Sequence, residues 1–207
     1  LHLNENTVDE SESGIHYDST ANSANGIQSG NAAVAGMIAG AQDFDAGQDA
    51  TDQDYINVDN IDSDDWTEYT LSAWFRANEY SKSDPRIIAK SVSTSPDSFI
   101  FSLTQANSDA TTGQLRTRIA VEGGDGLSSG HYSGVTLTAN PGPWYYGTVT
   151  WLGTGTDDLY QRRAESGTVP NWDSAGSNTA DQDFVDTADD GTGPTLKDGT
   201  AQQNVVL

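Results

Sequence analysis

The 207-residue sequence predicts an all-β protein in which short antiparallel strands form a sandwich or a barrel. Three observations support this fold class. Apolar and polar residues alternate in several segments, as they do in strands with one buried face. Clusters of Gly, Pro, Ser, Asn and Asp separate these segments and predict turns. Helical periodicity is nearly absent, because the one candidate, 32–41 (AAVAGMIAGA), is interrupted by Gly36 and Gly40 and has no cap.

The segment 69–78, YTLSAWFRAN, is the clearest predicted strand. In an extended chain Leu71, Ala73 and Phe75 share one side, and Trp74 lies on the other. Two explanations of Trp74 stay open. Either loops cover the back of this strand in a two-layer sandwich, or its second face is a binding surface.

Three later segments alternate strongly, and two do so weakly. The residues predicted to share one face are Phe99, Phe101 and Leu103 in 98–105, Leu115, Thr117, Ile119 and Val121 in 113–124, and Tyr145, Gly147, Val149 and Trp151 in 142–153. The opposite faces carry Arg116 and Arg118 in 113–124, and Trp144, Tyr146, Thr148 and Thr150 in 142–153. The weaker strands are 85–92 and 131–139, and the stretch 167–199 is the least patterned part of the chain.

The charge of the chain excludes some partners. The formal net charge is −22, with 24 Asp, 7 Glu and only 9 basic residues. Nucleic acid and anionic membranes need a basic surface, so neither is expected as a partner. No apolar run approaches the length of a membrane span. Two explanations of the acidity remain: the scarcity of Lys favours a surface adapted to high salt, and clustered Asp residues favour calcium sites.

The order of these segments resembles that of laminin-G-like (concanavalin A-like) domains of secreted prokaryotic proteins. The resemblance is carried by LHLNEN, GIHYDSTANSANGIQSG, AGAQDFDAGQDATDQDYINV, YTLSAWFRAN, RIIAKS, DSFIFSLTQANSDATTGQLRTRI and GPWYYGTVTW, which together span about residues 1 to 165. The family pattern departs after Trp151, where LGTGTDDLYQRRAESG replaces the usual Asp-Gly turn. The resemblance implies a two-sheet antiparallel jelly-roll sandwich as a single domain over 1–207, with the strand 69–78 central and buried.

Candidate site residues fall in two sets. The acidic stretch 43–65 offers the densest group of oxygen ligands, and Asp45, Asp49, Asp52 and Asp54 around Gly47 are the candidate ligands of Ca²⁺. Laminin-G-like relatives often hold one Ca²⁺ at a loop edge. Aromatic residues in or beside loops could stack on sugar rings, and Tyr132, Tyr160 and Trp172 are the candidates.

Catalytic patterns are weak, so we expect a protein that is not an enzyme. The closest carboxylate stretch is DESES at 9–13, which falls in a predicted loop, and His2, His16 and His131 stand far apart in the sequence without a nucleophile pattern. Two function classes remain. The first is an extracellular module that binds a glycan or a surface protein. The second is a structural module of a surface layer, filament or virion that assembles with other copies or proteins.

Overall fold

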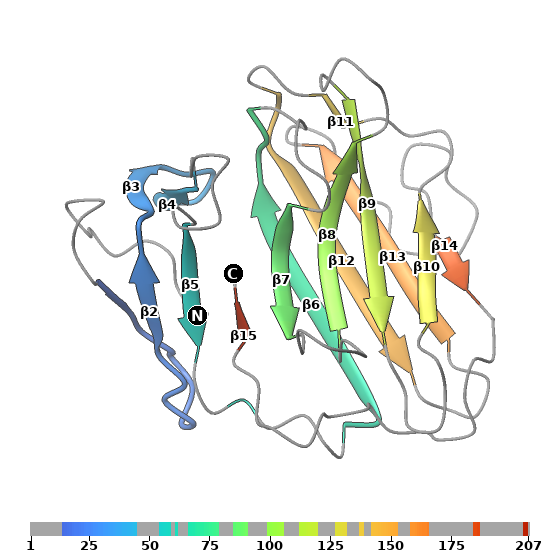
Figure 1. Ribbon diagram of the computed structural model, residues 1–207, viewed down its shortest axis with the longest axis horizontal. Helices are drawn as coiled ribbons and strands as arrows, with labels where there is room; N and C mark the ends of the chain where they lie inside the picture. The colour runs from blue at the N-terminus through green and yellow to red at the C-terminus, as the bar shows by residue number, and fades with distance from the viewer. Residues whose placement is uncertain are drawn as a thin grey trace. The chain divides into compact units, whose positions relative to one another are not determined.

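The computed structural model describes residues 14–44, 54–58, 61, 66–78, 85–90, 99–105, 112–119, 127–131, 137–138, 142–152, 158–165, 184–186 and 205–206 (Figure 1). These residues form antiparallel β-sheets and contain no helix, so the prediction of an all-β class is confirmed for them. Within this part of the chain, no helix could serve as a membrane span. The chain divides into two compact units, Leu1–Asp62 with Gln202–Leu207 (unit 1) and Ser63–Ala201 (unit 2). That residues 1–207 form one domain stays a prediction.

Unit 1 holds six described strands. They are β1 (Ile15–His16), β2 (Gly26–Ser29), β3 (Ala32–Ala35), β4 (Gly40–Asp43), β5 (Tyr55–Val58) and β15 (Val205–Val206). β2 pairs with β1 and β5, and β5 also pairs with β15, all antiparallel. β3 and β4 form a separate hairpin.

The hairpin β3–β4 occupies the segment that was the helical candidate. The N–H of Gly36 donates to the carbonyl of Ala39 at 2.9 Å, which closes the turn. A Cβ on Gly36 would stand 2.4 Å from the carbonyl oxygen of Gly40, so the two glycines permit a close approach of the strands that a helix does not need. Ala-rich composition did not decide the structure here, because the glycines favour the turn.

The buried side of unit 1 is rich in polar groups. His16, Gln28 and Asn31 are buried beside the apolar Ile56 and Val58. The Nε2 of His16 lies 3.3 Å from the Oε1 of Gln28, and the Nε2 of Gln28 donates to the backbone carbonyl of Asn31. The Nδ2 of Asn31 donates to the Oε1 of Gln42 at 2.7 Å. A chain of hydrogen bonds therefore links β1, β2 and the hairpin.

Unit 2 holds nine described strands in two groups. They are β6 (Glu68–Phe75), β7 (Arg86–Lys90), β8 (Phe99–Gln105), β9 (Thr112–Ile119), β10 (Leu127–His131), β11 (Leu137–Thr138), β12 (Tyr145–Leu152), β13 (Asp158–Glu165) and β14 (Phe184–Asp186). One group has the order β7-β8-β9-β10, and β11 also pairs with β9. The other is a four-stranded sheet with the order β14-β13-β12-β6.

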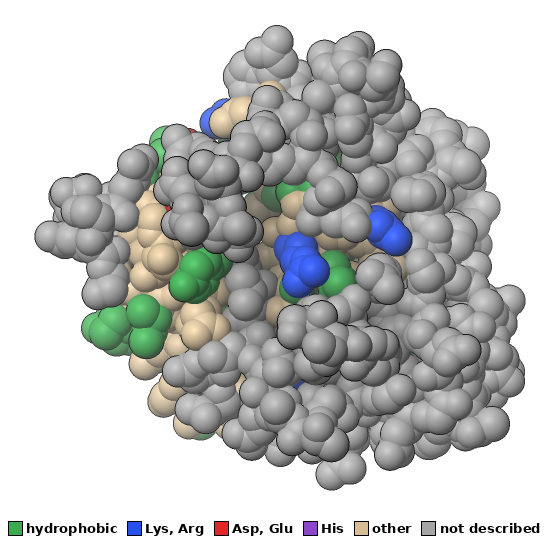
Figure 2. Space-filling view, in the orientation of Figure 1, with side chains coloured by type: hydrophobic (Ala, Val, Ile, Leu, Met, Phe, Trp, Pro, Cys, Tyr) green, Lys and Arg blue, Asp and Glu red, His purple; other side chains and the backbone are tan. Residues whose placement is uncertain are grey.

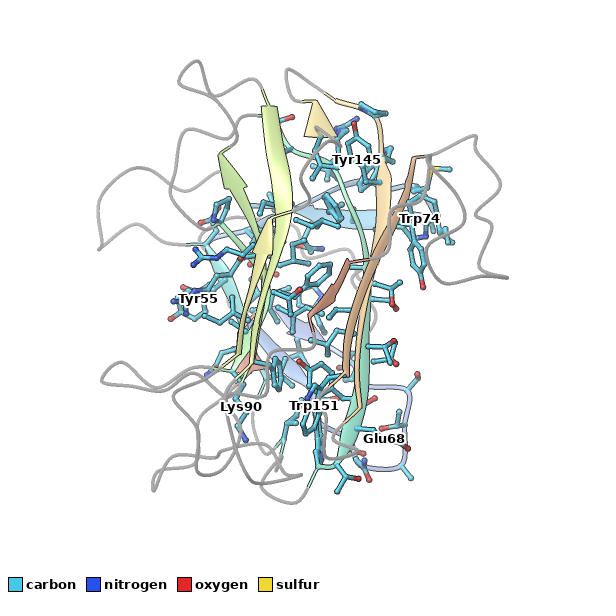
Figure 3. The ribbon with its side chains drawn as sticks, turned by 90° about the vertical axis from the view of Figure 1, so that its right-hand side faces the viewer. Tyr55, Glu68, Trp74, Lys90, Tyr145 and Trp151 are labelled. Atoms are coloured by element: carbon cyan, nitrogen blue, oxygen red, sulfur yellow. The ribbon has the colours of Figure 1, made fainter. Side chains whose placement is uncertain are left out.

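Aromatic rings fill the space between these two groups of strands. Phe99 of β8 lies 5.4 Å from Tyr69 of β6 between ring centroids, and Tyr69 lies 5.7 Å from Trp151 of β12. A Cβ on Gly147 would stand 2.9 Å from the rings of both Phe101 and Phe75. Figure 3 shows Tyr145 and Trp151 on this inner side. The inner faces predicted for 98–105 and 142–153 are therefore correct.

Two features of unit 2 differ from the predictions. The segment 131–139 is not one strand, because β10 ends at His131 and β11 begins at Leu137. The strand β6 ends the order of its sheet among the described strands, whereas the resemblance implied a central strand. Its outward positions at Glu68, Thr70, Ser72 and Trp74 are exposed. The segment LHLNEN lies outside the described residues.

Candidate functional site

The outer face of β6 and β12, which we name the β6–β12 face, carries two aligned columns of side chains. The two strands pair over eight residues without a register shift. Trp74 pairs with Tyr146, Ser72 with Thr148, and Thr70 with Thr150. Because directly opposed residues of an antiparallel pair share a face, each pair forms one row across this face. Three rows two residues apart span about 14 Å along the strands.

Two of the rings on this face form an aromatic row. The ring centroids of Trp74 and Tyr146 are 5.2 Å apart, and the planes are tilted by 47°. Trp74 is 37% exposed, whereas Phe75, next to it in the chain, is buried. Figure 3 shows Trp74 on the side of β6 that faces away from Tyr145 and Trp151. The β6–β12 face therefore offers an accessible aromatic surface that the core does not use.

A cation–π pair extends the columns by one row. The guanidinium carbon of Arg76 lies 5.1 Å from the ring centroid of Trp144. Arg76 follows β6 and Trp144 precedes β12, so this row continues the register beyond Trp74 and Tyr146. Arg76 is exposed and Trp144 is half-buried. The cation–π contact favours a position of the guanidinium over the Trp144 ring, and the exposed guanidinium can donate hydrogen bonds to a ligand.

Hydroxyl groups make up the other rows of the face. The Oγ1 atoms of Thr70 and Thr150 lie 3.0 Å apart, and either can donate. Ser72 is exposed and Thr148 is half-buried in the next row. Each hydroxyl can donate one hydrogen bond and accept two, so these rows can pair with polar groups of a ligand. Glu68, also exposed, ends the β6 column.

The strand β13 continues the face on the side of β12. Tyr160 is the register partner of Thr150, and Arg162 is the register partner of Thr148. Their backbone positions therefore belong to the same face as the hydroxyl rows. Of the three predicted ligand-binding residues, Tyr160 has its position at the β6–β12 face. Tyr132 and Trp172 lie outside the described residues.

The calcium prediction falls mostly outside the described residues. This is so for Asp45, Asp49 and Asp52, whereas Asp54 is half-buried immediately before β5. Gly30 adopts a positive φ of 86°, and a Cβ there would stand 2.1 Å from the Oδ1 of Asp54. Among the described residues, no three His, Asp or Glu side chains gather in a way that could hold a metal ion. The calcium site stays a prediction.

Among the residues that the structure describes, Asp18 and Tyr69 have pKa values shifted by their surroundings. The carboxylate of Asp18 accepts from the Oγ1 and N–H of Thr20 and from the N–H of Ala24, at 2.5, 2.9 and 3.0 Å. These hydrogen bonds, first the one from the Thr20 hydroxyl, hold the pKa of Asp18 below its ordinary value. Burial raises the pKa of Tyr69 well above its ordinary value. Both pKa shifts therefore arise from the fold itself, through hydrogen bonds at Asp18 and burial at Tyr69.

The histidines that the structure describes have separate surroundings. His16 belongs to the buried hydrogen-bond chain of unit 1, and His131 pairs in register with Arg116 in unit 2. The stretch DESES and His2 lie outside the described residues. The prediction of a protein that is not an enzyme therefore stays a prediction.

The sequence prediction left open that the second face of the strand 69–78 is a binding surface, but it did not choose residues of the β6–β12 face other than Tyr160 as site candidates. It looked for exposed aromatics in loops and assigned Trp74 and Trp144 to the core or to sheet faces. The missing information was the register of the two strands, which sets Trp74 beside Tyr146 and Arg76 beside Trp144. The sequence did contain a signal for this site, because both YTLSAWFR and WYYGTVTW alternate between two faces that each carry an aromatic ring.

Comparisons of this chain with protein-family models, with curated proteins and with solved structures found no match.

Proposed function

We propose that this chain is a non-catalytic binding module that holds a glycan on the β6–β12 face. The observation that carries the proposal is Trp74, which is exposed beside Tyr146 on a face lined with hydroxyl groups. Sugar rings present C–H groups that stack on aromatic rings, and their hydroxyls pair with Thr and Ser side chains. An exposed Trp74 beside a half-buried Tyr146 on a strand face fits that chemistry.

The proposed architecture for this module is a jelly-roll sandwich of the laminin-G-like type. Its support is the antiparallel pairing of every described strand and the ring contacts between β8 and the strands β6 and β12. We also propose an extracellular surface location in a high-salt environment, for which the net charge of −22 is the support. Added KCl in the molar range should then raise the melting temperature, and a fall would contradict this part of the proposal.

The glycan proposal is tested by titrating the whole chain with a panel of soluble oligosaccharides in an isothermal calorimeter. We expect at least one oligosaccharide to bind and Trp74→Ala to weaken that binding about tenfold or more, because the sugar ring loses its stacking partner. Tyr55→Ala is the matched control, since Tyr55 is an exposed aromatic of unit 1 with a similar exposed fraction. The proposal fails if Trp74→Ala binds as the unsubstituted chain does.

A second candidate function, assembly with other copies, rests on unit 1. Exposed large apolar side chains there are Ile15, Tyr17, Ile27, Val34, Met37, Ile38, Phe44 and Tyr55. Figure 2 shows hydrophobic side chains on the surface over β2 and β5. Apolar patches of this kind mark protein contacts. Sedimentation velocity tests it: assembly predicts oligomers that the double substitution Ile27→Ser with Tyr55→Ser dissociates, and a monomer at all concentrations contradicts it.

The calcium prediction is proposed alongside both functions. Asp45, Asp49, Asp52 and Asp54 supply the oxygen ligands that Ca²⁺ prefers. Removal of calcium with EDTA at fixed ionic strength should lower the melting temperature, and CaCl₂ should restore it. An unchanged melting temperature would argue against a structural calcium.

A further inference from the structure

We propose that the β6–β12 face selects glycans that carry carboxylate groups, with Arg76 binding the carboxylate and Trp74 holding the neighbouring sugar ring. This inference rests on the proposed glycan-binding function and adds the chemical class of the ligand. Its observations are the cation–π row next to the aromatic row and the distribution of charge along the face.

The placement of Arg76 suits an anion. Its guanidinium carbon lies 5.1 Å from the centre of the Trp144 ring, within the range of a cation–π contact. The N–H groups project from the edge of the guanidinium plane, and Arg76 is exposed to solvent. That fork matches the two oxygens of a carboxylate, and the contact with Trp144 favours one placement of the side chain before the ligand arrives.

The sugar ring has its place one row away. Trp74 and Tyr146 follow Arg76 and Trp144 in the same two columns, at a distance of about 7 Å along the strands. A ring on Trp74 would therefore lie beside a carboxylate on Arg76. The hydroxyl groups of the next sugar residues along the glycan would meet the row of Ser72 with Thr148 and the row of Thr70 with Thr150.

Charge along the face gives the ligand a direction. The chain has only 9 basic residues against 31 acidic ones. Arg76 stands at one end of the β6 column, whereas Glu68 stands at the opposite end. Arg76 and Glu68 are about 27 Å apart along an extended strand. An acidic glycan therefore finds attraction at the Arg76 end and repulsion at the Glu68 end.

The occupant is a saccharide rather than an acidic peptide, because only one of the four rows, that of Arg76 and Trp144, carries a positive charge. Of the remaining rows, one is aromatic and two carry hydroxyls. An acidic peptide would use the Arg76 row and leave the other three without specific partners. A uronic acid oligomer uses all four, since each unit combines a carboxylate, a ring face and hydroxyls.

The test measures binding of the whole chain to oligogalacturonides and to the same oligomers after reduction of their carboxyl groups. The buffer contains EDTA, so that no metal ion bridges the ligand to an acidic loop. We expect the acidic oligomer to bind at least about fivefold more tightly than its reduced form, and Arg76→Gln to remove that preference. Trp74→Ala should weaken both ligands.

Control variants separate the alternatives. Arg86→Gln replaces an exposed arginine at the start of β7 and should leave the preference unchanged. Arg76→Lys keeps the charge without the planar fork and should retain part of the preference. The melting temperature of each variant is measured to establish that the variant is folded.

The outcomes separate the two proposals. Equal binding of the acidic and reduced oligomers would overturn the carboxylate inference and leave the glycan proposal standing. Equal competition by oligo-aspartate would overturn it in favour of an acidic peptide. Binding of no glycan at all, here or in the wider panel, would overturn both.

Discussion

Unit 1 and unit 2 distribute their apolar side chains in opposite ways. In the described part of unit 2 the large apolar side chains lie inside, from Phe99 and Phe101 to Val149 and Trp151, and Trp74 is the exposed exception. In the described part of unit 1 many large apolar side chains are exposed, up to 71% for Ile38, while His16, Gln28 and Asn31 are buried.

This difference separates two ways to stabilise β-strands. Ring packing between two layers stabilises unit 2, and the energy of that packing scales with the area removed from water. Hydrogen bonds among buried side chains link the strands of unit 1, and each bond contributes less than a buried ring. The exposed groups also differ: among the described residues of unit 2, Trp74 is the exposed large apolar side chain and stands in an ordered row, whereas unit 1 exposes eight large apolar side chains in its described part.

The largest expected effect is the loss of a ring from unit 2. Phe101→Ala should lower the free energy of unfolding by about 3–5 kcal/mol, because Phe101 is 0% exposed and contacts the opposite sheet. Ile27→Ala in unit 1 should change it by less than about 0.5 kcal/mol, since Ile27 is exposed. Chemical denaturation followed by tryptophan fluorescence measures both. Equal effects would remove the contrast between the units.

A smaller effect is expected from added volume between the sheets of unit 2. Gly147→Ala should destabilise the fold by about 1–3 kcal/mol, because its Cβ would meet the rings of Phe101 and Phe75 at 2.9 Å. Thr148→Ala, one residue later on the outer face, is the control and should change the stability little. An unchanged free energy of unfolding for Gly147→Ala would contradict this close packing and show that the sheets of unit 2 lie further apart.

The hydrogen-bond chain of unit 1 is tested by Gln28→Ala. The substitution removes the partner of the His16 ring and the donor to the Asn31 carbonyl, and should cost about 1–2 kcal/mol. Ser29→Ala, on the half-buried next position, is the control. Unchanged stability of Gln28→Ala would mean that the polar groups of unit 1 do not contribute to its fold.

The smallest effect concerns Asp18 and depends on pH. Hydrogen bonds from Thr20 and Ala24 lower the pKa of Asp18 below its ordinary value of 3.8, so the ionised carboxylate stabilises the folded state. This contribution is fully present above pH 3.8 and is lost as the pH falls through the lowered pKa. The melting temperature of Asp18→Asn should therefore lie slightly below that of the unsubstituted chain near pH 6, and the gap should close in acid. A gap that is constant with pH would contradict the cause assigned to the shift.

The strands of unit 2 were predictable because their alternation is strong. Phe99, Phe101 and Leu103 were assigned to one face, and all three are buried. The alternation does not determine pairing, however, and so the position of β6 at the end of its sheet could not be read from it. The hairpin β3–β4 was missed as well, since Ala-rich segments carry little alternation and only Gly36 and Gly40 indicate the turn.

The candidate site was less predictable than the fold. Trp74 was recognised as the residue on the unexpected side of its strand, which is the correct observation. The step from Trp74 to a site needed Tyr146, Trp144 and Arg76, which are brought together by pairing between segments far apart in the sequence. The predicted aromatic candidates Tyr132 and Trp172 stay predictions, because both lie outside the described residues.

The central claim is that β6 turns one side to the core and the other to a ligand, and neighbouring substitutions test it most directly. The measurement is the free energy of unfolding of Trp74→Ala and Phe75→Ala by chemical denaturation. We predict a loss of about 3–5 kcal/mol for Phe75→Ala and of less than about 1.5 kcal/mol for Trp74→Ala, whose ring contacts Tyr146 at the surface. An equal loss for the two variants would place Trp74 in the core and contradict the account.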